Sequence, residues 1–522
     1  MKAKKNIILT LAAATVALSS CNSLLDIPQH GAQSLENYYQ TDEEAENAII
    51  ACYIQAKGNS FNALLGKNML TDDFWAGGAA RADNAQLEQL NEFTFATDQG
   101  FLEGMFTSYY GIIYKANVVI GHVPEETEVQ KRARAEAKVF RAWSYFELIS
   151  MWGNPPLVDH ELTPSEYHKP NGTTKELWGL VEKDLTEAIA SGCLTEKANA
   201  DDKVWRITKQ YAQALLGKAY LWQKKYDLAA ETFDEIVESE KYRLYENYEN
   251  VINYHAKQNC ESMFESVRIL NPANEWEDFY NLAGVMVHFR TDKLEDGCCP
   301  KIGLATSGWG FCNPKKDLYD DFVAVEGENG YRLNATIKTY NQMQEMGVKI
   351  KGTEKIINEG YFMWKWRYTD EQEMDGINGM VDHGNTVWMR YAEVLLCAAE
   401  AHLMNNNPGE ADKYMNMIRT RAQAPKKSGY TLEDIQREKR IELCGENVRF
   451  QDLLRWGIAE EKMKDQGGVY PNLVANGDVT WTIINDSDKG NEKYGFKSRH
   501  NLLPYPGTEI RLNPNITQNP GW

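Results

Sequence analysis

One short stretch of the sequence combines a tryptophan with polar side chains of the kinds that bind sugars. Residues 71–84 read TDDFWAGGAARADN, and the paired glycines after Trp75 allow the loop to expose its ring. Pyranose rings present apolar C–H faces that stack on flat aromatic rings, and their hydroxyl groups hydrogen-bond with carboxylates, amides and guanidinium groups. We therefore expect Trp75 to act as a sugar-binding platform. The side chains expected to supply the hydrogen bonds are Asp72, Asp73, Arg81, Asp83 and Asn84.

Two further tryptophans lie in loop-like sequence. Trp309 is flanked by glycines in GWGF, and Trp276 lies in NPANEWEDFYNLAG among asparagines and glutamates. Both patterns favour ligand binding, because irregular segments carried by a rigid scaffold often form binding sites. The alternative for each tryptophan is a structural role. Trp75 would then close the end of a helix, and Trp309 would support the helix expected at 314–322.

Sequence patterns for catalysis are absent. The chain contains no HExxH, GxSxG or GxxxxGKS motif. Glycoside hydrolases use paired carboxylates, but with 75 acidic residues in the chain such pairs are common and do not indicate this activity. We therefore expect no enzyme activity and no cofactor. Asp320 and Asp321 have the oxygen ligands that calcium uses, although a solvated acidic surface would look the same.

The first twenty residues predict a secretion signal. Three lysines precede an apolar run at 7–18, which is too short for a permanent membrane helix. The run ends in Leu-Ser-Ser-Cys, which resembles the bacterial lipobox. Cys21 would then be diacylated, carrying groups such as palmitate, and would become the first residue of a durably anchored lipoprotein. The alternative is ordinary secretion with Cys21 present by chance.

Composition narrows the range of partners. A net charge of −19 over 522 residues disfavours nucleic acids and sulfated glycans. Cys52, Cys397 and Cys444 fall in apolar helical patterns and are expected in the core. Three further cysteines, Cys298, Cys299 and Cys312, lie close together in the sequence, and two of them could form a disulfide in an oxidising compartment. Their spacing contains no CxxC pair, which argues against a zinc site.

Most of the chain is predicted to be helical. Residues 42–57 have apolar side chains at helical spacing, with Thr41 as N-cap and Glu44 completing a capping box. Residues 131–153 form a longer amphipathic pattern that ends at a glycine before two prolines. Residues 175–192 repeat that design.

A tetratricopeptide-like pattern appears twice. Residues 216–236 have the Leu-Gly-x-x-Tyr and Ala-x-x-x-Phe spacings of two antiparallel helices, and 398–418 contain a weaker copy. Such repeats usually hold a partner. The copies are not in tandem, so we do not expect a regular array. The matching residues of the first copy are Leu216, Gly217, Tyr220, Ala229 and Phe233.

The chain divides into four predicted parts. The signal at 1–20 ends before Cys21, and an N-terminal helical region follows at 22–239. Residues 240–385 are rich in Tyr, Gly, Asn and Trp and are predicted to be a loop-rich insertion with a short strand at 361–369. One of the alternating Trp364 and Trp366 should face the core. A C-terminal helical region follows at 386–522, with an extended tail at 502–522.

These pieces together resemble the SusD/RagB family of outer-membrane nutrient-binding lipoproteins of Bacteroidetes. The resemblance is carried, in order, by CNSLLDIPQHG after the lipobox and by the stretches at 132–158, 389–403, 437–457 and 502–522. It covers essentially the whole mature chain. One departure is Tyr505, where the family often has isoleucine.

The resemblance implies a mostly α, SusD-like tetratricopeptide scaffold with a few short strands. It implies an anchor in the outer leaflet of the outer membrane and a SusC-like, TonB-dependent barrel over which the lipoprotein closes. It also implies glycan ligands, contacted in part by the loop after the first helices. The alternatives are a RagB-type peptide-binding lipoprotein and a purely structural lid or interaction partner of the barrel.

Charged residues alternate in sign within 437–457. At helical spacings this alternation favours ion pairs that tie helices together, whereas the functional alternative is an acid–base pair. The residues concerned are Glu438, Arg440, Glu442, Glu446, Arg449, Asp452 and Arg455.

Overall fold

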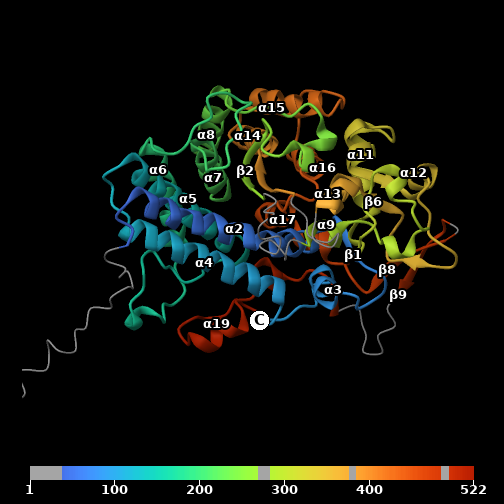
Figure 1. Cartoon of the computed structure of the whole chain (residues 1–522), viewed down its shortest axis with the longest axis horizontal. Helices are drawn as coiled ribbons and strands as arrows, with labels where there is room; N and C mark the ends of the chain where they lie inside the picture. Colours follow the sequence, from blue (N-terminus) through green and yellow to red (C-terminus); the bar gives the residue numbers. More distant parts are fainter. Residues whose placement is uncertain (1–37, 269–281, 376–383, 476, 484–492) are drawn as a thin grey trace, which may run out of the picture.

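The computed structural model describes residues 38–268, 282–375, 384–475, 477–483 and 493–522 (Figure 1). It is mostly helical with a few short strands, which confirms the predicted fold class. Predicted site residues Cys21 and Trp276 lie outside the described residues. The division of the chain at 240 and 385 stays a prediction.

Three long helices form the N-terminal frame: α2 (Asp42–Met69), α4 (Gly100–His122) and α5 (Glu128–Trp152). The predicted capping box opens α2, because the Glu44 backbone N–H donates to Thr41 Oγ1 at 3.2 Å and Thr41 N–H donates to Glu44 Oε2 at 2.9 Å. The helix continues past the predicted end at 57. Its second half is covered by neighbours, so polar residues there are buried as well and the amphipathic pattern fades.

The two tetratricopeptide-like pairs meet in space although they are far apart in sequence. In the first pair a Cβ atom on Gly217 would lie 2.6 Å from the Phe233 ring, so the glycine allows the close helix contact that the pattern predicts. Helix α14 packs against α8, so the two pairs form one layer (Figure 1). The first pair consists of α7 (Lys209–Trp222) and α8 (Tyr226–Glu238), and the second of α14 (Tyr391–Met404) and α15 (Pro408–Arg421). Helix α6 (Thr174–Ala190) packs against both α5 and α7.

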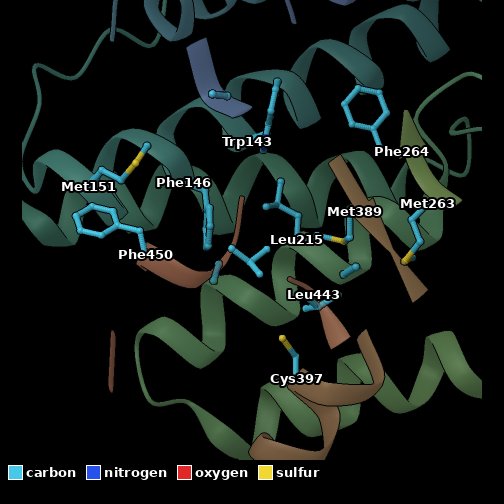
Figure 2. Packing of buried hydrophobic residues seen from close by; sticks show 14 of the residues in the cluster. Trp143, Phe146, Met151, Leu215, Met263, Phe264, Met389, Cys397, Leu443 and Phe450 are labelled. Carbon is cyan, nitrogen blue, oxygen red and sulfur yellow. The ribbon is translucent and has the colours of Figure 1, made fainter. Parts of the chain in front are cut away.

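The main core joins the N-terminal and C-terminal halves. Figure 2 shows Trp143 and Phe146 of α5 packed near Leu215 of α7 and Met389 of β7 (Thr386–Arg390). Strand β7 pairs antiparallel with β2 (Ser262–Ser266) in the same core. The cysteines predicted to be core, at 52, 397 and 444, are at most 1% exposed. Residues from both halves are therefore needed to close one hydrophobic core.

The charged residues of 437–457 are paired across helices, as predicted. Buried Arg332 contacts Glu438 at 2.7 Å and Glu442 at 2.6 Å. Arg390 contacts Glu446 at 2.6 Å and shares Glu442. Because ions this deeply buried are costly without partners, the network fixes how the C-terminal helices dock. These helices are α16 (Leu432–Glu442), α17 (Arg449–Trp456) and α18 (Ala459–Met463).

The tail is only partly extended. We expected no helix in 502–522, but Gly507–Leu512 forms the short helix α19, directly after Pro506. A proline before the first turn does not obstruct a helix, because the first N–H groups need no partner within it. Tyr505 is buried and its hydroxyl donates to the Trp152 carbonyl at 3.1 Å. The departure from isoleucine at this position therefore adds a hydrogen bond.

The middle region carries short elements instead of long helices. Strand β1 (Phe74–Gly77) pairs antiparallel with β3 (Phe311–Pro314), β4 (Ile337–Thr339) with β6 (Tyr361–Met363), and β8 (Val469–Val474) with both β5 (Lys355–Ile356) and β9 (Val479–Ile483). The strand predicted at 361–369 ends earlier than expected, at Met363, because a 3-10 turn follows at Trp364–Trp366. The short helices are α3 (Ala85–Asn91), α9 (Ala283–Val287), α10 (Lys316–Glu326), α11 (Tyr331–Thr336), α12 (Tyr340–Glu345) and α13 (Asp370–Asp375).

Within the part of the chain that the structure describes, no helix has both the length and the apolar composition needed to cross a bilayer.

Candidate functional site

Two loops that the sequence singled out separately lie side by side. Strand β1 pairs with β3, with Trp75 opposite Asn313, so residues 71–84 and 307–314 are neighbours. A third segment joins them. The Gly310 carbonyl accepts from Gly78 N–H at 2.7 Å, and Gly310 N–H donates to the His288 carbonyl, also at 2.7 Å. Three segments thus converge at Gly310.

This convergence explains the glycines around Trp309. A Cβ atom on Gly308 would lie 2.1 Å from the Phe289 carbonyl oxygen, and one on Gly77 would lie 2.2 Å from the Gly310 carbonyl oxygen. Gly310 also has a φ of +70°, which disfavours any other residue. The backbone on both sides of Trp309 is therefore clamped by contacts that only glycine permits.

Trp309 lines a surface hollow of about 580 Å³. The Trp309 side chain is half-buried, and its backbone N–H donates to the Val285 carbonyl at 2.9 Å. Buried Cys298 and Cys299 form part of the hollow's wall, so the hollow combines an aromatic ring and apolar surface with a polar rim. The polar side chains that line it are Arg290, Thr291, Asp292, Glu295, Asp296, Thr306, Ser307 and Lys351.

Arg290 fastens Trp309 to the loop that carries Trp75. Its Nη1 donates to Asp83 Oδ2 at 3.0 Å and to the Trp309 carbonyl at 3.1 Å. Its Nε lies 2.7 Å from Asp292 Oδ1. Sequence reasoning missed Arg290, because nothing in its local sequence indicates that two distant loops meet there.

Trp75 is half-buried and held at its edge. Its indole N–H donates to Glu359 Oε2 at 2.9 Å, and the Lys315 ammonium lies 4.9 Å from the ring centroid. Burial lowers the pKa of Lys315 to about 8. The ring is thus fixed in orientation by Lys315, directly after β3, and by Glu359, two residues before β6, while part of its surface stays accessible.

Three of the five polar residues expected beside Trp75, namely Asp73, Arg81 and Asn84, make contacts within the protein. Asp73 is 1% exposed and accepts from Arg440 Nε at 2.7 Å. Asn84 caps α3, accepting from Leu87 N–H at 3.2 Å. Arg81 Nη1 contacts Glu92 at 3.0 Å. These side chains support the loop, so we do not include them in the proposed ligand surface.

A second, smaller cavity of about 120 Å³ lies near the first site. Trp366 lines it and stacks on Phe74, with ring centroids 5.3 Å apart and planes at 17°. Trp364, its alternating neighbour, is buried, as expected for one member of the pair. Amide side chains in this cavity belong to Asn253, Gln372, Asn385 and Asn447.

The acidic pair considered for calcium is engaged in ion pairs. Asp320 contacts Lys316 at 2.5 Å, and Asp321 contacts Arg440 at 2.6 Å. Among the described residues, no group of three or more potential ligands is arranged to hold a metal ion. The sulfur atoms of Cys298 and Cys299 are 3.9 Å apart, and Cys312 is also a free, buried thiol.

Family models match both ends of the chain. A model described as "SusD family" matches residues 318–522, and one described as "Starch-binding associating with outer membrane" matches residues 34–221. The second range contains the Trp75 loop, and the first contains the helices with the buried ion pairs.

Individual proteins match along nearly the whole length. A SusD-like protein of Bacteroides ovatus is 26% identical, with 99% of this chain and 98% of that protein covered. The SusD-like protein P38 of Formosa agariphila is 24% identical over 90% of this chain and 95% of its own length.

Solved structures agree on the fold. A laminarin-binding SusD-like protein superposes with a TM-score of 0.76 at 28% identity, covering 93% of this chain and all of that one. Surface glycan-binding protein A from Bacteroides thetaiotaomicron, solved in complex with laminarihexaose, gives a TM-score of 0.72 at 22% identity, with 92% of this chain and 99% of that chain covered. The chain belongs to the SusD/RagB family.

Proposed function

We propose that this protein binds oligosaccharides in the hollow beside Trp309 and performs no covalent chemistry on them. The observation that carries the proposal is Trp309, a half-buried residue that stands on a glycine-clamped backbone and lines a hollow of about 580 Å³. A ring held in this way offers a preorganised stacking surface to the C–H face of a sugar. Hydroxyl, carboxylate and cationic side chains around it can meet the sugar's hydroxyl groups.

The relatives support a carbohydrate ligand. The 28% identical structural neighbour is named as laminarin-binding, and one family description names starch. The names differ in the sugar, so they support the ligand class and not a particular glycan. A stacked aromatic ring fits both, because many neutral hexoses offer an apolar face.

The protein would act at the cell surface. In the proposal Cys21 is diacylated after removal of residues 1–20, and the lipid holds the protein at the outer face of the outer membrane. Bound glycan would then pass to a SusC-like TonB-dependent barrel on which the protein closes. The lipobox sequence and the family description "associating with outer membrane" support this placement. Mass spectrometry of the N-terminal peptide from membranes would test lipidation at Cys21.

The binding test uses the soluble form that starts after Cys21. We expect electrophoresis through gels containing different polysaccharides to retard it in at least one neutral glycan gel. Trp309→Ala should remove the retardation without unfolding the protein. Calorimetry with a peptide digest runs in parallel. Binding to peptides alone would replace this proposal with the RagB-type function, and binding to neither would mean that the free lipoprotein is not the binding unit.

A further inference from the structure

We infer that the hollow beside Trp309 accepts uncharged glycan chains and rejects chains that carry carboxylate or sulfate groups. The inference rests on the proposed function, because it concerns the ligand class of the same hollow. It comes from the charges around the rim and not from the names of relatives.

Exposed carboxylates dominate the rim. Asp292 and Asp296 have side chains that are 54% and 97% exposed, and Glu295 is also exposed. All three line the hollow on one short loop. The loop therefore presents several negative charges to anything that enters.

The cations at the rim are already paired. Arg290 contacts Asp292 at 2.7 Å and Asp83 at 3.0 Å, and Lys351 Nζ lies 3.4 Å from Asp296. An anionic ligand would have to displace these pairs to find a cation. Glu295 makes no ion pair with any described residue, so its charge is uncompensated within this part of the chain.

Thr306 and Ser307, which also line the hollow, do not compensate for this charge. The carboxylate of Glu373 accepts from both of their backbone N–H groups, at 2.7 and 2.8 Å. These N–H donors are therefore occupied by an acid from within the chain. The buried cysteines in the wall add apolar surface, and burial raises the pKa of the Cys299 thiol, so it stays uncharged.

The discrimination follows from hydrogen-bond polarity. Ionised carboxylates only accept hydrogen bonds, so they suit the O–H groups of a neutral sugar. A carboxylate or sulfate on the ligand would face acceptors and like charges. Like charges about 4 Å apart repel by roughly 1 kcal/mol in bulk water and more near a protein surface, and salt screens them over about 8 Å at physiological strength. Several such contacts predict a preference of about tenfold or more for the neutral chain.

The experiment compares two forms of one glycan. The neutral polysaccharide that binds best in the gel panel is oxidised at its primary hydroxyl groups to carboxylates, or sulfated if it has none. Both forms are then measured by calorimetry against the soluble protein. We expect the anionic form to bind at least about tenfold more weakly than the neutral form. This gap in affinity between the two forms should narrow as salt is added.

Two variants assign the effect to the rim. The triple variant Asp292→Asn, Glu295→Gln, Asp296→Asn should reduce the gap to about threefold or less. The double variant Glu295→Gln, Asp296→Asn keeps the Arg290–Asp292 pair and should narrow the gap without loosening Trp309. A matched control, Glu231→Gln, Glu238→Gln and Glu240→Gln, removes exposed charges on and just after α8, which lies away from β1 in Figure 1. None of these residues lines the hollow, so the control should leave the gap unchanged.

The outcomes separate the inference from the function beneath it. Equal binding of both forms, or an anionic glycan as the best ligand, would overturn the inference and leave glycan binding in place. A gap that the rim variants do not change would overturn the assignment to these carboxylates. No binding of any glycan would remove the proposed function and the inference together.

Discussion

The carboxylate of Asp73 and the guanidinium group of Arg440 form a buried ion pair, with 2.7 Å between Oδ1 and Nε. Their side chains are 1% and 8% exposed. Next to this pair, Asp72 contacts Arg449 at 2.8 Å. The loop that carries Trp75 is therefore anchored to α16 and α17 through Asp72 and Asp73.

Replacing Asp73 with asparagine should destabilise the protein. The substitution removes the charge that compensates Arg440 in a buried environment, and losing one partner of such a pair costs about 3–5 kcal/mol. Arg440 keeps Asp321 at 2.6 Å, so we expect a loss of about 3 kcal/mol. Urea unfolding measures it. Asp98→Asn, which changes an exposed aspartate just before α4, is the control; equal stability of both variants would contradict the anchoring role.

Trp309→Ala should weaken glycan binding by about tenfold or more, because the stacking surface is lost. We expect a stability loss of only about 1–2 kcal/mol, since the ring is half-buried. Calorimetry and thermal unfolding separate the two effects. Trp205 is 42% exposed and its ring stacks on Arg206, so Trp205→Ala should keep the affinity. If Trp309→Ala lost stability but bound normally, Trp309 would be a core residue only.

Arg290 and Asp83 should act as one unit in binding. Removing either residue breaks the side-chain contact that holds the Trp309 loop against the Trp75 loop, so Arg290→Ala and Asp83→Asn should each raise the dissociation constant about fivefold. The double variant should be little worse than Arg290→Ala alone, because both changes break the same contact. Dissociation constants measured by calorimetry for the wild type and all three variants complete this double-mutant cycle. Additive effects would show that the pair does not position the ring. The control is Arg243→Ala, because Arg243 contacts Asp201 and does not line the hollow.

Local patterns predicted the helical frame well. Thr41 with Glu44, the glycine at 153, and the Gly217–Phe233 spacing are all short-range features, and each occurs where the sequence places it. Such features depend on residues within a few turns, whose spacing a helix fixes. The helical repeats were therefore predictable, although their meeting in space was not.

Long-range polar contacts were not predictable. Asp73 looked like a ligand residue because its partner Arg440 is 367 positions away, and Asp83 is 207 positions from Arg290. A carboxylate in a loop has the same local sequence whether it faces a sugar or a buried guanidinium group. Only the folded structure distinguishes the two, and it retains Trp309 at the hollow while engaging Asp73 in the interior.

Gly217→Ala should destabilise the first tetratricopeptide-like pair. The added methyl group would lie 2.6 Å from the Phe233 ring, and overpacking of this kind costs about 1–3 kcal/mol. Phe233→Leu makes room, so the double variant should be no less stable than Phe233→Leu alone. Urea unfolding of the three variants tests this coupling. Simple addition of the two losses would mean that the helices shift apart without steric conflict.

Acid should destabilise the protein partly through His288. The side chain is fully buried, its Nδ1 accepts from Tyr368 N–H at 3.3 Å, and burial lowers its pKa from 6.5 to about 4. Between these values the unfolded chain binds a proton that the folded chain does not, so stability falls as pH drops from about 6.5 to about 4. The loss approaches about 1.4 kcal/mol per pH unit. His288→Asn can keep the hydrogen-bond acceptor but does not titrate. Urea unfolding at pH values across this window should therefore show a shallower decline for the variant than for the wild type. Parallel declines would assign the acid sensitivity to other groups and would mean that His288 is protonated equally in the folded and unfolded chains.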